Sequence, residues 1–332
     1  MTKISILGAG SIGCWIGGHL AEGGGDVSLI GRDRFAADIK SNGLTLTHFE
    51  RSDIHLDEIP YETHHGSLAV TDIIIVCTKS QDTEKAAIQI AENARSDVTI
   101  VSFQNGIRNA EILKSVLPPS MTVIPAIVPF NVTPSGKGRF HCGTAGDLVL
   151  ATDIEAVTHP LKKSGQGIKV SENIDGDQWA KMIVNLNNGL NTLCGTTLRA
   201  CLLQRDYRQA LAVCVEEAIN VADERGVKIG EFNGRSPELL LKILRLPNWA
   251  YRLVMQFVVK IDKKARSSML DDLETGRVSE IDYLQGEIVR QAKKTGHLAP
   301  RNQAVYEAVR LAFDQGISPK LNGTDLLKLV SS

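Results

Sequence analysis

The first 30 residues alternate between apolar and amphipathic segments. Residues 3–7 and 26–30 are short β-rich runs of the kind found in buried parallel strands. The apolar residues between them recur at helical spacing: Ile12, Trp15, Ile16 and Leu20. Three glycines at 23–25 end this segment. The pattern predicts a strand–helix–strand unit.

The same alternation continues to about residue 172. Apolar runs at 72–77 and 98–102 predict strands, and the first is apolar enough to be covered on both faces. Residues 81–94 and 107–117 predict helices, the second ended by two prolines. Shorter strand-like runs follow without long helices between them: 123–128, 138–142, 147–151 and 167–170. We expect a parallel sheet that finishes in a more antiparallel edge.

From residue 175 the hydrophobic pattern changes to a period of 3.6 residues. It predicts four long helices: 178–193, 205–225, 280–294 and 300–315. Gly226, Gly296 and Gly316 are the expected helix stops. With a hinge within 171–176, the chain divides into domains of residues 1–172 and 176–332.

Composition narrows the functional classes. A chain of 332 residues suits two domains, and 43% apolar with 23% charged residues is typical of a soluble globular protein. The net charge of -1 argues against nucleic-acid or membrane partners, and no apolar run is long enough to span a bilayer. The N-terminus enters a strand at once, which leaves no room for a signal peptide. Six scattered cysteines match neither a disulfide framework nor zinc spacing, so we expect no metal and a cytoplasmic location.

The turn after the first strand has the sequence Gly8-Ala9-Gly10-Ser11-Ile12-Gly13. In a G-x-G-x-x-G turn, the first glycine allows a tight turn, the second a close approach to a pyrophosphate, and the third close helix–strand packing. The N–H groups of Ser11 and Ile12 at the start of the helix then face the phosphates. The alternative is a glycine-rich turn with no ligand, but the strand–helix context favours a dinucleotide site.

The end of the second strand indicates which dinucleotide. NAD sites of this type place a carboxylate there, whereas this strand ends in Gly31-Arg32. Glycine leaves space for a 2′-phosphate and the Arg32 guanidinium can bind it, which predicts NADP. The alternative is that Arg32 is only a solvated surface charge.

The predicted helix 178–193 has two contrasting faces. One is an apolar stripe of Trp179, Met182, Ile183, Leu186, Leu190 and Leu193. The other groups Lys181, Asn185, Asn188 and Thr192, although asparagine is a poor helix former. This suits a cleft wall with one proton donor and several amides; the alternative is an exposed polar face. Thr78-Lys79 and Gln104-Asn105-Gly106 follow predicted strands, where α/β sheets bind ligands, although each could be only a turn.

These residues together resemble the ketopantoate reductases (2-dehydropantoate 2-reductases). The resemblance spans nearly the whole chain in four blocks: GAGSIG, the lysine and QNG after the strands, Lys181-x-x-x-Asn185, and S-S-M-x-x-D-x-x-x-G-R-x-x-E-I-D from Ser267 to Asp282. It implies an α/β fold, with an N-terminal Rossmann-type doubly wound sheet that binds NADPH and an all-α C-terminal domain for substrate and catalysis. It also implies NADPH-dependent reduction of a 2-oxo acid, 2-dehydropantoate or a relative.

The resemblance implies a role for each matching residue. Lys181 is the expected general acid and Glu280 the active-site glutamate, which also borders the cofactor. Asn185 is the expected substrate ligand and Ser268 the contact for the substrate carboxylate. Lys79 and Asn105 match residues between cofactor and substrate. Burial would lower the pKa of Lys181 and Glu280 would raise it, and the sequence does not decide between them.

Two departures from the family pattern bear on the substrate. Position 189 is glycine where members often have a second asparagine, and Asn188 beside it is the expected replacement. The apolar stretch 231–264 is longer than in a compact member. It predicts a protein interface such as a homodimer, a roomier substrate pocket, or simply a larger helical core. A 3-hydroxyacid dehydrogenase would lack the S-S-M…E-I-D block, and a non-catalytic NADP-sensing protein would be expected to lack Lys181 or Glu280.

Overall fold

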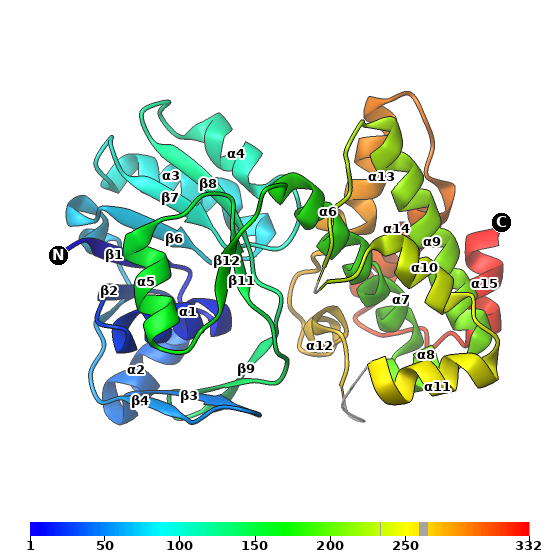
Figure 1. The fold of residues 1–332 in the computed structure, drawn as a ribbon, viewed down its shortest axis with the longest axis horizontal. Coiled ribbons are helices and arrows are strands. Elements are labelled where there is room, and N and C mark those ends of the chain that lie inside the picture. The colour runs from blue at the N-terminus through cyan, green and yellow to red at the C-terminus, as the bar shows by residue number, and fades with distance from the viewer. Residues whose placement is uncertain (233, 259–264, 332) are drawn as a thin grey trace. The chain divides into compact units, whose positions relative to one another are not determined.

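The computed structural model describes residues 1–232, 234–258 and 265–331, apart from the side chains of 255–258. The chain forms two compact units, Met1–Ile174 and Asp175–Ser332. Figure 1 colours the first from blue to green and the second from green to red.

The first unit is built on an eight-stranded sheet with the order β12-β11-β8-β7-β6-β1-β2-β5. Its strands are β1 (Lys3–Leu7), β2 (Asp26–Ile30), β5 (Tyr61–Glu62), β6 (Ile73–Val76), β7 (Thr99–Ser102), β8 (Thr122–Ile127), β11 (Leu148–Leu150) and β12 (Ile168–Val170). Neighbouring strands pair in parallel except β8 with β11, which confirms the expected antiparallel edge.

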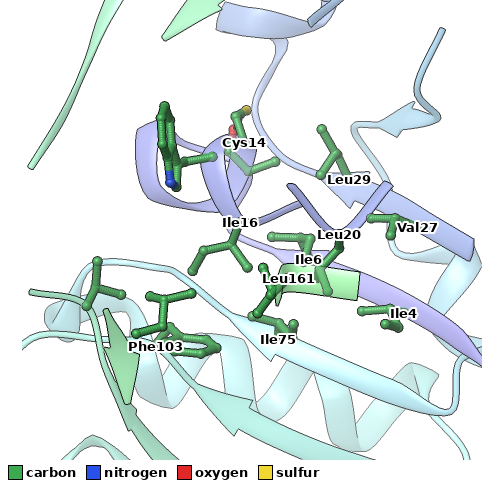
Figure 2. Packing of buried hydrophobic residues seen from close by; sticks show 14 of the residues in the cluster. Ile4, Ile6, Cys14, Ile16, Leu20, Val27, Leu29, Ile75, Phe103 and Leu161 are labelled. Atoms are coloured by element: carbon green, nitrogen blue, oxygen red, sulfur yellow. Dashed lines mark hydrogen bonds between the residues drawn. The ribbon is translucent and has the colours of Figure 1, made fainter. Parts of the chain in front are cut away.

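Helices cover both faces of this sheet. They are α1 (Ser11–Glu22), α2 (Asp33–Asn42), α3 (Thr83–Asn93), α4 (Asn109–Val116) and α5 (Glu155–Lys163), with short 3-10 turns η1 (Gly66–Val70) and η2 (Ser80–Asp82). Strand β6 contributes Ile73 and Ile75 to one core and Ile74 and Val76 to the other, as its continuous apolar run predicted. Figure 2 shows part of the first core, with residues of β1, α1, β2, β6 and α5 packed together.

A second sheet in this unit was not anticipated. Its order is β4-β3-β10-β9, with β3 (Leu44–His48), β4 (Ile54–Leu56), β9 (Val132–Gly136) and β10 (Arg139–Cys142). The run 138–142 therefore does not finish the main sheet: β10 pairs in parallel with β3, a partner nearly 100 residues earlier. Helix α5 was also missed, because Pro160 inside it disguises the helical pattern.

All the secondary-structure elements assigned in the described part of the second unit are helices, so the expected all-α fold is confirmed there. The elements are α6 (Ile174–Asn185), α7 (Asn187–Cys194), α8 (Leu198–Leu202), α9 (Arg205–Glu224), α10 (Pro237–Leu244), α11 (Asn248–Val258), α12 (Ser268–Glu274), η3 (Ile281–Tyr283), α13 (Gln285–Lys294), α14 (Pro300–Gln315) and α15 (Gly323–Ser331). Helices α9 and α14 match their predicted spans. The glycines after them, Gly226 and Gly316, have φ of +67° and +68°, as helix stops require.

The predicted single helix 178–193 is instead two helices that meet at Leu186. The Leu186 N–H is shared between the carbonyls of Met182 (3.1 Å) and Ile183 (3.2 Å). Asparagines at positions 185, 187 and 188 favour such a break, because their side chains compete for backbone hydrogen bonds. The apolar stripe of the prediction is nevertheless buried along both helices.

Arg208 of α9 links the apolar helices α10 and α11 to the rest of the unit by hydrogen bonds and a ring contact. Its side chain is fully buried and donates to the carbonyls of Leu244 (3.3 Å) and Leu246 (3.2 Å) and to Asn248 Oδ1 (2.8 Å). The guanidinium also lies 4.0 Å from the centre of the Tyr251 ring. Several hydrogen bonds and a cation–π contact therefore compensate the burial of this charge.

Two general properties follow from the described residues. None of their helices combines the length and apolar character needed to cross a membrane. All six cysteines are free thiols, and five are buried like small apolar side chains.

Candidate active site

The glycine-rich turn between β1 and α1 contains three glycines. Packing requires glycine at two of these positions but not at the third. A Cβ atom at Gly8, where φ is +95°, would lie 2.6 Å from the Thr78 amide nitrogen, and one at Gly13 would lie 2.4 Å from the Gly8 carbonyl oxygen. At Gly10, by contrast, no neighbouring atom would come closer than 4.0 Å. No side chain caps the N-terminus of α1. Gly10 therefore leaves open space beside free helix amides, the arrangement that a phosphate group requires.

Beside the end of β2 lies Tyr61 of β5, a tyrosine that sequence reasoning missed. The Tyr61 hydroxyl lies 3.1 Å from the carbonyl oxygens of both Ala9 and Arg32. A Cβ atom at Gly31 would lie 2.2 Å from this hydroxyl. The space predicted for a 2′-phosphate at Gly31 is thus filled by Tyr61, and Gly31 is needed for packing. Burial raises the pKa of Tyr61, so its hydroxyl stays neutral.

The Arg32 side chain lies just beyond this point and is 87% exposed. Its Nη2 atom is 3.3 Å from Asp82 Oδ2, in the turn that follows β6. An ion pair between such exposed groups contributes little to stability, so the guanidinium can exchange one anionic partner for another.

The loops after β6 and β7 are joined by a buried amide. Gln104 Nε2 donates to the Thr78 carbonyl (3.2 Å) and to Thr83 Oγ1 (2.8 Å). Ser80 Oγ donates to the Asn105 carbonyl at 2.6 Å. These bonds hold the segment with the half-buried Lys79 against the one with the exposed Asn105. Because β7, β6, β1 and β2 are parallel neighbours, both loops lie at the same sheet edge as the glycine turn.

In the second unit, Lys181 on α6 is a buried lysine with only 8% of its surface exposed. Burial lowers the pKa of its ammonium from 10.5 to about 8, although the Glu280 carboxylate acts to raise it. Asn185 and Asn188 are half-buried, and Thr192, which is buried, donates to the Asn188 carbonyl at 2.9 Å. The alternative of an exposed polar face is therefore wrong.

Glu280 was expected to begin a helix that continues to residue 294. It instead precedes the short turn η3, and α13 begins at Gln285 after Leu284 leaves helical geometry (φ −118°, ψ −100°). The Ser279 hydroxyl accepts a hydrogen bond from the Ile281 amide at 3.1 Å, which fixes the backbone on both sides of Glu280. Within the unit, this carboxylate is the charge that acts on Lys181.

Ser268 is the exposed first residue of α12, and the residue before it is tightly held. The Ser267 hydroxyl accepts from the Leu270 amide (3.2 Å), while the Ser267 amide donates to Asn191 Oδ1 (3.0 Å). Asn191 is fully buried, and its Nδ2 donates to the Thr196 carbonyl at 2.9 Å. Sequence reasoning missed Asn191; the available signal was an asparagine among the apolar residues of α7.

The predicted site residues thus fall into two groups. Those expected to bind the cofactor lie, except for Glu280, at one edge of the main sheet in the first unit: Gly8, Gly10, Ser11, Ile12, Gly13, Arg32, Lys79 and Asn105. Those expected to bind and protonate the substrate lie on helices or beside them in the second unit: Lys181, Asn185, Asn188, Ser268 and Glu280.

Both units match one family of known proteins. Residues 4–153 match the family described as "Ketopantoate reductase PanE/ApbA", and residues 173–312 match "Ketopantoate reductase PanE/ApbA C terminal". The 2-dehydropantoate 2-reductase of Pyrococcus horikoshii is 30% identical over 332 residues, covering 93% of this chain and 96% of the relative. The chain belongs to the ketopantoate reductase family.

Solved structures agree with this assignment. A ketopantoate reductase of the PanE/ApbA family from Ralstonia eutropha JMP134 has a TM-score of 0.81 at 28% identity, covering 95% of this chain and 99% of its own. D-mandelate dehydrogenase, solved with NADH and anilino(oxo)acetate, has a TM-score of 0.79 with the same coverage. At 23% identity, the second likeness shows the shared fold alone. As a ketopantoate reductase family member, the protein is an oxidoreductase that acts on a CH–OH group or the corresponding ketone.

Proposed function

We propose that this protein reduces a 2-oxo acid, 2-dehydropantoate or a close relative, to the 2-hydroxy acid with NADPH. The observation that carries the proposal is Lys181, a buried lysine with a pKa of about 8 beside a carboxylate. A lysine on a solvated face would keep its ordinary pKa near 10.4 and would be a weak proton donor at neutral pH.

The residues of the first unit fit a phosphorylated dinucleotide. Open space at Gly10 beside the uncapped start of α1 suits a pyrophosphate, with the amides of Ser11 and Ile12 as donors. Arg32 is an exposed cation at the position where NAD enzymes use a carboxylate, which favours the 2′-phosphate of NADP. Lys79 and Asn105 are the residues we propose between the nicotinamide and the substrate.

The residues of the second unit would handle the substrate and the proton. NADPH, when bound, supplies the hydride that the carbonyl carbon accepts. Lys181 donates its proton to the keto oxygen as negative charge develops there, and Glu280 keeps Lys181 protonated. Asn185 and Asn188 offer amides to the polar groups of the acid. The exposed hydroxyl of Ser268 would bind its carboxylate.

The direct test is NADPH oxidation with a panel of 2-oxo acids. The panel should include 2-dehydropantoate and an aryl 2-oxo acid, because D-mandelate dehydrogenase shares the fold. NADH in parallel assays tests the cofactor preference. Turnover with at least one 2-oxo acid is the expected result; tight NADPH binding without turnover of any of them would refute the proposed reaction.

We also propose that the protein forms a homodimer through α10 and α11. These helices present exposed apolar side chains: Leu239 (44%), Trp249 (70%) and Leu253 (52%). One structural relative is a ketopantoate reductase from Staphylococcus aureus that is described as dimeric. Part of the predicted 231–264 stretch, residues 233 and 259–264, lies outside the described residues.

Sedimentation velocity tests the dimer. The double substitution Trp249→Glu and Leu253→Glu should give a monomer, whereas Leu298→Glu, at a still more exposed leucine outside α10 and α11, should not. A monomeric unmodified protein would refute the interface. The six free thiols fit a reducing compartment, for which we propose the cytoplasm.

A further inference from the structure

Gln285, the first residue of α13, is a fully buried amide to which the proposed mechanism gives no task. Its Nε2 atom donates to the Leu186 carbonyl at 2.7 Å. Its Oε1 atom is buried and has no hydrogen-bond partner in the described part of the chain. The orientation of the amide follows from this bond, since a carbonyl oxygen requires the nitrogen as its donor.

The space for this side chain comes from Gly189 on α7. A Cβ atom there would lie 2.8 Å from Gln285 Nε2 and 2.9 Å from Oε1. Glycine inside a helix costs about 1 kcal/mol relative to alanine, so its presence needs a cause. The amide of Gln285 is that cause, and it accounts for the glycine where an asparagine was expected.

Gln285 therefore contacts the break between α6 and α7 at Leu186 and the first turn of α7 at Gly189. Leu186, whose carbonyl it binds, directly follows Asn185, and Gly189, on which it rests, directly follows Asn188. The break sets the direction in which these two asparagines leave the backbone. A buried hydrogen bond with fixed packing holds that direction more strictly than packing alone.

We propose that Gln285 is a positioning residue for the 2-oxo acid, which it aligns by fixing Asn185 and Asn188 through the α6–α7 break. This inference rests on the proposed function of the two asparagines. Gln285 itself touches the backbone of α7 and not the reacting atoms.

The test separates the hydrogen bond from the filling of space. Gln285→Asn shortens the side chain by one methylene, so it no longer reaches the Leu186 carbonyl and leaves a gap over Gly189. Adding Gly189→Ala fills the gap without restoring the bond. Gln291→Asn is the matched control, because Gln291 is a buried amide of the same helix that bonds to Glu287 Oε1 (2.7 Å).

We expect Gln285→Asn to raise KM for the 2-oxo acid about three- to tenfold, the loss of one net hydrogen bond, with KM for NADPH unchanged. The double variant should regain thermal stability but keep the raised KM, and Gln291→Asn should leave both KM values unchanged. Recovery of KM together with stability would show that Gln285 only fills space and would overturn the proposal. If the unmodified enzyme reduces no 2-oxo acid of the panel, the proposed function itself fails.

Discussion

Replacing Lys181 with methionine removes a proton donor and a buried charge in one step, so activity and stability should change in opposite directions. Loss of a general acid typically lowers kcat by about 10²–10⁴-fold. The pKa of Lys181 falls from 10.5 to about 8, and at about 1.4 kcal/mol per pH unit this corresponds to about 3 kcal/mol of unfavourable burial of the charged form. Methionine, which has a similar length and no charge, should therefore raise the free energy of unfolding at pH 7 by up to about 3 kcal/mol.

The stability difference between Lys181→Met and the unmodified protein should depend on pH in a definite direction. Between pH 8 and 10.5, the unfolded chain binds a proton at position 181 that the folded chain has released, so the stability of the unmodified protein rises with pH in this range. Below about pH 8 the cost of the buried charge is fully present. The stability advantage of Lys181→Met should accordingly be largest below pH 8 and vanish near pH 10.5.

Urea unfolding at several pH values measures the stability, and steady-state kinetics with a confirmed 2-oxo acid measures kcat. For the unmodified enzyme, kcat should decline above about pH 8, as Lys181 loses its proton. Glu280→Gln removes the charge that raises this pKa, so the decline should move to lower pH. A Lys181→Met enzyme with kcat within a few-fold of the unmodified one, or with the same stability difference at pH 7 and pH 10.5, would refute the reasoning.

Three further predictions concern other parts of the chain. Gly10→Ala should leave thermal stability unchanged but weaken NADPH binding. Gly13→Ala, whose Cβ would meet the Gly8 carbonyl, should instead cost about 1–3 kcal/mol of unfolding free energy. Equal stability of the two variants in urea unfolding would contradict this prediction. Arg32→Ala should weaken NADPH binding about ten- to a hundredfold and NADH binding little, as measured by fluorescence titration; equal losses would remove Arg32 from the 2′-phosphate site. Arg208→Met leaves buried carbonyls unpaired, so it should lower the unfolding free energy by about 3 kcal/mol and speed proteolysis in α10 and α11. Arg245→Met, which removes a half-exposed surface ion pair, should do neither.

The sequence was most informative where a local residue pattern is compatible with only one kind of structure. The apolar run of β6 could be placed because a strand buried on both faces has no polar alternation. The polar face of Lys181 was found because asparagine is rare in solvated helices. Both inferences need only neighbouring residues.

What escaped prediction depends on distant partners. Strand β10 joins β3 across some 90 residues, and no local pattern specifies that register. The glycine at 189 is explained by Gln285, almost a hundred residues away, whose amide also binds the Leu186 carbonyl at the break. Whether burial or Glu280 dominates the pKa of Lys181 depends on how deeply the lysine is buried. The sequence alone does not give that depth.

Tyr61 of β5, beside the end of β2, restricts where a carboxylate could enter this site over evolution. An NAD enzyme of this type carries a carboxylate at the end of this strand, but a side chain at position 31 collides with the Tyr61 hydroxyl. Asp or Glu could enter at position 31 only after Tyr61 had moved or become smaller, and that first step would remove the hydroxyl's bonds to Ala9 and Arg32. A carboxylate at position 31 therefore requires a weakened intermediate, whereas the exposed position 32 could exchange Arg for Asp or Glu in one step.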